Sequence, residues 1–204
     1  MKVRGLLIVV TIGAMGVALV PSAAAGGGGS GRSPHTERIE IEDRCDPATF
    51  NADPPVGPGL GPGTCFGDRD TTFADFIAQM TAERQVDHWA FHPSEKTIRV
   101  GDSLAAVSNG GEFHTFTEVA KFGGGCVDLL NAILGLSPVP ECAPTVTLPD
   151  GSVVPSKFLT TGVPAAEAAP GFVLPVKNLT KGTHLFQCLI HPWMKSTITV
   201  RAAS

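Results

Sequence analysis

The sequence contains no tyrosine and has little charge of either sign. Charged residues make up 17% of the chain, and the formal net charge of −4 excludes the basic footprint that nucleic-acid-binding domains carry. After residue 25 no apolar run is long enough to cross a bilayer as a helix, so we expect no membrane span there. The 43% of hydrophobic residues is enough to bury a core in a chain of 204 residues, which excludes wholesale disorder.

Turn-forming residues are abundant, because the chain has 24 glycines and 17 prolines. Short β-prone runs lie between them from residue 86 onward. The clearest are at 104–108, 113–119, 145–148, 157–159, 172–176, 184–188 and 197–200. Many short strands separated by turns are typical of an antiparallel sandwich or barrel rather than a helical bundle. The sequence therefore predicts an all-β fold.

The first 25 residues have the features of an export signal. Lys2 and Arg4 form a positive start, residues 6–20 are an apolar run, and Ala23-Ala24-Ala25 provides a cleavage site. The run is short for a span of about 20 residues, so we expect cleavage of residues 1–25, with an uncleaved anchor as the alternative. Cleavage would leave 13 basic and 19 acidic residues, a formal charge of −6. We expect an exported protein that is periplasmic, at the cell surface or secreted.

The chain has five cysteines, an odd number for a protein in an oxidising compartment. Their spacings favour two local disulfides, Cys45–Cys65 and Cys126–Cys142. Cys188 is then unpaired. A free thiol is a liability outside the cell unless something occupies it, and a metal ion would do so.

Composition divides the remaining chain into three parts. Residues 26–34 form a glycine-rich linker, and residues 35–84 an irregular extension rich in Pro, Gly and Asp that ends in a short amphipathic helix at 72–84. Residues 85–204 form the β domain. Within it, residues 122–142 include a second short helix at 127–136 that the Cys126–Cys142 bridge would hold compact.

The most informative stretch is residues 184–194. It places a thiolate, an imidazole and a thioether at C-x2-H-x2-M spacing, through Cys188, His191 and Met194. Soft sulfur and imidazole ligands favour copper over hard cations, and a blue copper site needs two His and one Cys with a weak axial Met. This loop supplies three of the four ligands, so a second histidine must come from elsewhere.

His114 is the best candidate for that second histidine, because it follows the turn at 109–111 at the entry to a strand. His88 and His92 lie upstream and are interpreted as surface residues, and His35 lies next to the linker. His184 would share a strand face with Cys188 but lie about 13 Å from it, too far to bind the same ion.

These motifs give the chain a resemblance to the plastocyanin and amicyanin group of cupredoxins. Residues 101–104, the following turn, His114 and the segment 182–194 occur in the same order, and the C-x2-H-x2-M loop has the short amicyanin-like spacing. The resemblance covers residues 85–204 and implies an eight-stranded Greek-key sandwich. It also implies one copper ion that changes between Cu(I) and Cu(II). The insertion at 122–142 and residues 35–84 depart from the minimal fold.

Neighbouring residues have expected supporting roles. Phe186 should point into the core beneath the metal, Thr115 should hydrogen-bond across to the Cys188 loop, and Pro192 should stiffen that loop. For each of these, ordinary packing is an equal alternative. We expect an exposed edge of His191 as the route for electrons, inside an apolar docking patch. The residues expected in that patch are Phe122, Leu189, Ile190 and Trp193.

A copper ion whose four ligands all come from the protein has no open position for a substrate. We therefore expect a monomeric electron carrier that is not an enzyme, with protein partners as donor and acceptor. Two alternatives stay open. One is a copper-binding or storage protein without a redox partner. The other, a domain of a copper oxidoreductase, is disfavoured because the chain has no His-x-His pair and only six histidines.

Overall fold

The computed structural model describes residues 33–53, 59–142, 145–147, 153–155, 173–176 and 179–203. The segment expected to be an export signal, most of the expected glycine-rich linker and the strand expected at 157–159 lie outside the described residues. The described residues all belong to one compact unit. Among the described residues, no helix is long and apolar enough to cross a membrane.

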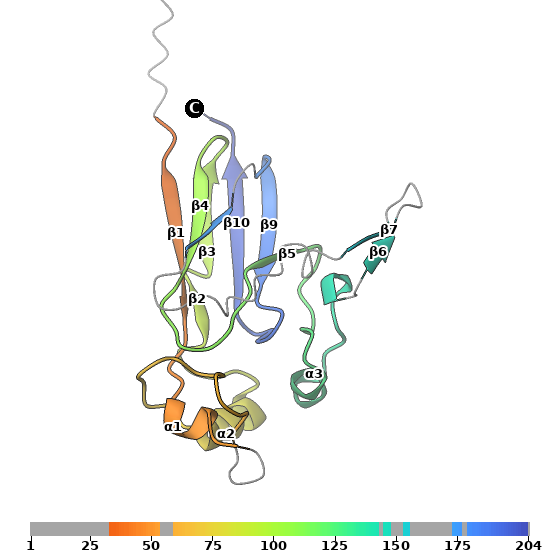
Figure 1. The fold of residues 1–204 in the computed structure, drawn as a ribbon. Helices are drawn as coiled ribbons and strands as arrows, with labels where there is room; N and C mark the ends of the chain where they lie inside the picture. Colours follow the sequence, from red (N-terminus) through yellow and green to blue (C-terminus); the bar gives the residue numbers. More distant parts are fainter. Residues whose placement is uncertain are drawn as a thin grey trace, which may run out of the picture. The chain divides into compact units, whose positions relative to one another are not determined.

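Two four-stranded sheets make up the body of this unit (Figure 1). Their strands are β1 (Thr36–Glu42), β2 (Ala90–His92), β3 (Glu95–Arg99), β4 (Ser103–Ser108), β5 (Thr117–Val119), β8 (Val173–Val176), β9 (Gly182–Gln187) and β10 (Lys195–Arg201). The strand order is β2-β1-β4-β8 in the first sheet and β3-β10-β9-β5 in the second. A separate two-stranded ribbon pairs β6 (Thr145–Thr147) with β7 (Val153–Pro155).

The predicted all-β sandwich is thereby confirmed, with one difference in strand direction. Each sheet is mixed rather than purely antiparallel, since β1 pairs with β4 and β3 pairs with β10 in parallel. Parallel neighbours need long crossover connections, and the chain provides them because 60 or more residues separate the two strands of each pair.

The core lies between the two sheets. Residues of the first sheet, such as Ile39 and Leu104, belong to the same buried cluster as Ile98 and Ile198 of the second. Along β10, buried and partly exposed residues alternate, as expected for a strand with one face on a core. The Phe186 ring stacks on Phe116 with ring centroids 4.4 Å apart, which joins the core to the segment that carries His114.

Strand β1 corrects the interpretation of residues 35–84 as an irregular extension outside the β domain. Residues Thr36–Glu42 lie in the first sheet between β2 and β4, so they belong to the sandwich. The pattern that predicts this strand is the alternation of Ile39 and Ile41 with glutamates, which places both isoleucines on the buried face.

The residues after β1 form what we call the cap, residues 44–53 and 59–86. It contains helix α1 (Pro47–Phe50) and helix α2 (Phe73–Glu83), and the Cys45–Cys65 disulfide closes it as predicted. The expected helix at 72–84 is confirmed, because Thr72 caps its start by accepting from Asp75 N, and Arg84 ends it in a left-handed conformation. Phe50 is fully buried against Phe76 and Trp89, so the cap shares the core of the sandwich.

The insertion after β5 also has the predicted form. Helix α3 (Asp128–Leu134) ends at Gly135, whose φ of 68° suits a glycine. A short 3-10 turn, Pro140–Cys142, follows, and the Cys126–Cys142 disulfide closes the segment. Cys188 is the one free cysteine of the protein and is buried, as the pairing predicted.

Replacing Cys45 and Cys65 together by alanine should lower the free energy of unfolding by about 3 kcal/mol, because the bridge restricts the unfolded chain over a 20-residue separation. Urea unfolding followed by tryptophan fluorescence measures this loss. The matched control is the double alanine variant of Cys126 and Cys142, whose 16-residue separation predicts a loss of similar size. Unchanged stability in both variants would contradict the prediction.

Candidate metal centre

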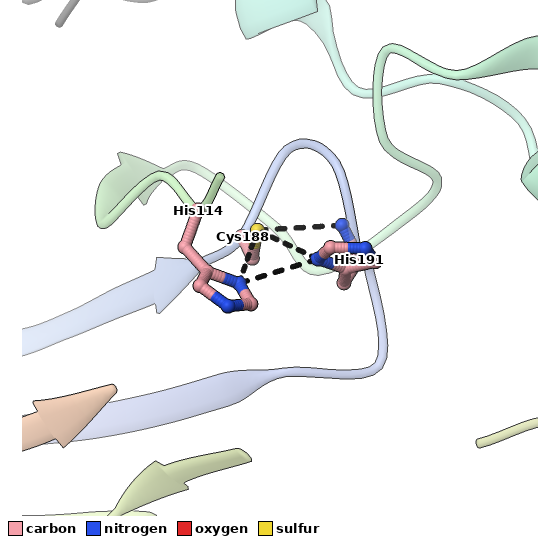
Figure 2. A group of neighbouring side chains, drawn as sticks. All are labelled: His114, Cys188 and His191. Carbon is pink, nitrogen blue, oxygen red and sulfur yellow. Dashed lines mark hydrogen bonds between the residues drawn. The ribbon is translucent and has the colours of Figure 1, made fainter. Parts of the chain in front are cut away.

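His114, Cys188 and His191 come together at the end of the sandwich that the cap covers. Cys188 follows β9 directly, and His191 lies in the loop between β9 and β10. His114 lies between β4 and β5, and Figure 2 shows this segment approaching the loop so that the three side chains converge. All three are buried, with exposed fractions of 0%, 0% and 3%.

The donor atoms form a triangle of the size that one metal ion requires. The Sγ of Cys188 lies 3.9 Å from the Nδ1 of His114 and 3.9 Å from the Nδ1 of His191, and the two Nδ1 atoms are 3.2 Å apart. Metal bonds of about 2.0–2.1 Å to nitrogen and about 2.3 Å to sulfur, typical for zinc, can be made together by an ion close to the plane of these atoms. The three residues therefore fit a trigonal His2Cys site, which is the arrangement of blue copper centres.

The sulfur of Cys188 is stabilised as a thiolate. Two backbone N–H groups donate to it, from Thr115 at 3.4 Å and from His191 at 3.3 Å. Burial raises the pKa of Cys188, but the hydrogen bonds and positive charge of His114 and His191 outweigh burial and hold that pKa well below its usual range. A thiolate is the form that binds a metal.

The loop that carries Cys188 and His191 is closed by its own backbone. Cys188 N donates to Met194 O at 3.0 Å, and Met194 N donates to His191 O at 2.9 Å. Met194 is 1% exposed and packs in the core beneath this loop, and Pro192 is also buried. The role of Met194 as the axial ligand stays a prediction.

Two of the expected supporting contacts are present. The Oγ1 of Thr115 accepts a hydrogen bond of 2.8 Å from Leu189 N, which ties the His114 segment to the Cys188 loop. Phe186 is 2% exposed and lies in the core. The expected strand at 113–119 begins only at Thr117, because Thr115 N donates to the Cys188 sulfur instead of to a neighbouring strand.

The other histidines lie outside the cluster. His88 and His92 are exposed, and His92 faces Glu42 at 3.7 Å. His184 pairs with Glu118 through Nδ1 at 2.8 Å, and His35 contacts Glu37 and Asp102. None of these four belongs to the group of residues that could hold a metal among those described.

Two buried carboxylates beside the histidines were not foreseen from the sequence. The Oδ2 of Asp43 lies 2.7 Å from the Nε2 of His114, and the Oε2 of Glu112 lies 3.6 Å from the Nε2 of His191 and 2.6 Å from the Nε1 of Trp89. Asp43 lies one residue beyond β1 and continues the alternation of the buried Ile39 and Ile41, so the pattern that predicts the strand also indicates an acid facing the core.

The contact between Asp43 and His114 favours the charged form of both side chains. Burial raises the pKa of Asp43, but hydrogen bonds from His114 and from backbone N–H groups outweigh burial and hold that pKa well below its usual range. Burial lowers the pKa of His114, but the hydrogen bonds to Asp43 and Cys188 outweigh this and raise it to about 10. Asp43 is thus ionised and accepts from Nε2, which directs Nδ1 of His114 toward Cys188. For Glu112, burial raises the pKa.

The expected exposed edge of His191 is not present. The ring packs against Phe76 of α2 and against Trp193, with centroid distances of 6.1 and 5.3 Å. Leu189 has no exposed area and so cannot belong to a docking patch, whereas Phe122, Ile190 and Trp193 are partly exposed. The expectation of an exposed His191 edge, and of Leu189 in the patch around it, is therefore wrong, because Phe76 and Trp193 pack against the His191 ring and Leu189 is fully buried.

The insertion packs beside the metal loop. Cys126 N donates to Leu189 O at 2.5 Å, and a Cβ on Gly125 would lie 2.3 Å from the same oxygen, so the approach requires a glycine. Leu189 also packs with Val119 and Val139. The insertion and the cap thus cover the Cys188–Met194 loop from two directions.

Comparisons with known proteins show a likeness of fold at low identity. No protein-family model matches the chain, and no curated protein matches it either. Among solved structures, a purple cupredoxin from Nitrosopumilus maritimus is 14% identical over 57% of this chain and 86% of its own, with a TM-score of 0.32. Oxidised plastocyanin from Dryopteris crassirhizoma is 19% identical over 56% and 90%, with a TM-score of 0.31. Reduced auracyanin from Roseiflexus castenholzii is 20% identical over 55% and 87%, with a TM-score of 0.28.

The structure has the β-sandwich and the His-Cys-His cluster that the resemblance to cupredoxins implied.

Replacing Thr115 by valine should lower the free energy of unfolding by about 1–3 kcal/mol, because the buried Leu189 N–H then has no acceptor. Thr115→Ser keeps the hydroxyl and is the control, for which we expect a clearly smaller loss. Urea unfolding of both variants makes the comparison. Equal losses would show that the methyl group, and not the hydrogen bond, stabilises this junction.

Proposed function

We propose that the protein is a mononuclear type 1 copper protein that carries single electrons. The observation that supports this most directly is the buried triangle of one thiolate and two imidazole nitrogens formed by His114, Cys188 and His191. Met194, buried on the same loop, is proposed as the weak axial ligand.

The donor set favours copper over other ions. Thiolate and thioether sulfur are soft ligands that disfavour calcium and magnesium, which bind oxygen. Structural zinc sites take four strong ligands in a tetrahedron, whereas here three strong donors fit an ion near their common plane. When bound, copper supplies the change between Cu(II) and Cu(I), and the protein holds both states in one set of ligands.

The burial of the site supports electron transfer rather than catalysis. The donor side chains are between 0% and 3% exposed, so a substrate has no direct approach to the metal. A preformed, closed ligand set also keeps the geometry similar in both oxidation states, which suits electron transfer without bond changes. We propose redox proteins as donor and acceptor.

Two aromatic rings pack against His191, Phe76 of the cap and Trp193 of the loop between β9 and β10. Phe76 is 4% exposed, but Trp193 is partly exposed and contacts both Phe76 and His191. Trp193 is therefore the proposed outlet for electrons in place of an exposed histidine edge.

An exported location is part of the proposal. The Cys45–Cys65 and Cys126–Cys142 disulfides support it, because such bonds persist in oxidising compartments. The charged and apolar pattern of the first 25 residues supports it independently.

The purified protein should bind one copper ion and show an intense visible band when oxidised, because a thiolate bound to Cu(II) gives strong charge transfer. Cys188→Ala should abolish the band. Met194→Leu should keep the band and raise the reduction potential, because a weak donor to Cu(II) is removed. Metal analysis, visible spectra and voltammetry make these measurements.

The same experiments separate the alternatives. A copper-loaded, oxidised protein without the band would contradict the type 1 assignment, and loss of copper from Met194→Leu would show that Met194 is not a weak ligand. Stopped-flow reduction and reoxidation by small redox reagents test whether the bound copper exchanges electrons. A blue protein that exchanges no electrons before it releases its copper would instead be a storage protein.

Replacing residues 125–143 by a short Gly-Ser linker should expose the metal loop and change both the reduction potential and the rate of electron exchange with small reagents. The reason is that the segment covers Leu189, next to Cys188. Voltammetry and stopped-flow kinetics on the blue, folded variant provide the measurement. An unchanged potential and rate would show that the insertion only adds stability.

A further inference from the structure

The strongest unassigned feature is the carboxylate of Asp43, which lies behind a proposed copper ligand. Its Oδ2 is 2.7 Å from the Nε2 of His114, and both side chains have no exposed area. The two residues are 71 positions apart in the sequence, so the contact depends on the fold. A buried carboxylate of this kind must be compensated by hydrogen bonds or charge, and here both are present.

Three backbone N–H groups and His114 surround the carboxylate of Asp43. Its Oδ1 accepts from Gly111 N at 2.9 Å and Cys45 N at 3.2 Å, and its Oδ2 accepts from Glu112 N at 2.9 Å in addition to His114. A Cβ on Gly110 would lie 1.8 Å from Oδ2, so the backbone closes on Asp43 in a way that only glycine permits. The side chain is therefore fixed before any metal binds.

A fixed carboxylate on the outer nitrogen of a ligand imidazole has two effects. It holds the tautomer and the ring orientation that present the other nitrogen to the metal, and it makes the imidazole a stronger donor. A buried negative charge also disfavours the addition of an electron to the ion, because attraction and repulsion are strong where water is excluded. Both effects favour Cu(II) over Cu(I).

We propose that Asp43 is a positioning residue that orients His114 toward the metal and lowers the reduction potential of the site. This inference rests on the proposed copper function. It assigns a role to the segment that leaves the first sheet, because Asp43 directly follows β1 and the Cys45–Cys65 disulfide begins two residues later.

The test compares Asp43→Asn with two controls in the copper-loaded, full-length protein. Asp43→Asn should shift the preference toward Cu(I) by tenfold or more, a rise of about 59 mV for a one-electron couple. Asp70→Asn makes the same chemical change at an exposed side chain and should leave the potential unchanged. Glu112→Gln removes a second buried acid, 3.6 Å from His191, and should have a smaller effect than Asp43→Asn.

A second measurement does not use copper. The affinity of the metal-free protein for Zn2+, which is redox-inert, should fall by about 10- to 100-fold in Asp43→Asn. If that variant does not fold, proton NMR of the wild type tests whether Asp43 holds the His114 ring. The Nε2–H of His114 should then appear as a slowly exchanging, strongly hydrogen-bonded signal, and its absence would overturn the proposal.

The outcomes separate this inference from the copper function. A wild type that binds no copper contradicts the proposed function. A blue wild type with an unchanged potential in Asp43→Asn overturns the role of Asp43 alone. An equal shift in Glu112→Gln would show that any nearby buried acid has this effect, which also overturns a specific positioning role.

Discussion

The fully buried sulfur of Cys188 is the constraint on which the surrounding structure depends. A buried anion is unfavourable unless donors and positive charge surround it. The protein supplies two backbone N–H groups, from Thr115 and His191, and two imidazoles. These groups come from two separate segments, so the segments must be joined, and the hydrogen bond from Leu189 N to Thr115 makes that junction. The local geometry at the end of the sandwich thus follows from the chemistry of one sulfur atom.

The cap and the insertion bury the loop around Cys188 further. The cap places Phe76 over His191, and the insertion places Cys126 against Leu189. Exclusion of water strengthens every charge interaction inside, including the pair of Asp43 and His114. The additions to the minimal sandwich therefore change the electrostatics of the centre as well as its access, which separates this protein from a carrier with an open metal edge.

The parts of the site that sequence alone predicted are local. Cys188, His191 and Met194 lie within seven residues, so their spacing carries the information, and the local spacing of the cysteines predicted the Cys126–Cys142 pair. Contacts between distant segments were not predictable in this way. Asp43 lies 71 residues from His114, and the Ile-Glu alternation of β1 is short and precedes a Pro- and Gly-rich region, which hides the strand from a reading of composition alone. The burial of His191 depends on where α2 packs, which no spacing in the chain records.

The position of the ligands along the chain has a consequence for the order of assembly. Asp43 directly follows β1, the first described strand, whereas Cys188 and His191 lie between β9 and β10. During synthesis Asp43 and His114 therefore emerge well before Cys188, and His191 follows Cys188 by three residues. A chain that stops before β9 lacks Cys188 and His191, so the binding free energy of an ion at this site is added only after both sheets can form. Occupancy of the centre therefore reports that the segments carrying Asp43, His114 and Cys188 have come together.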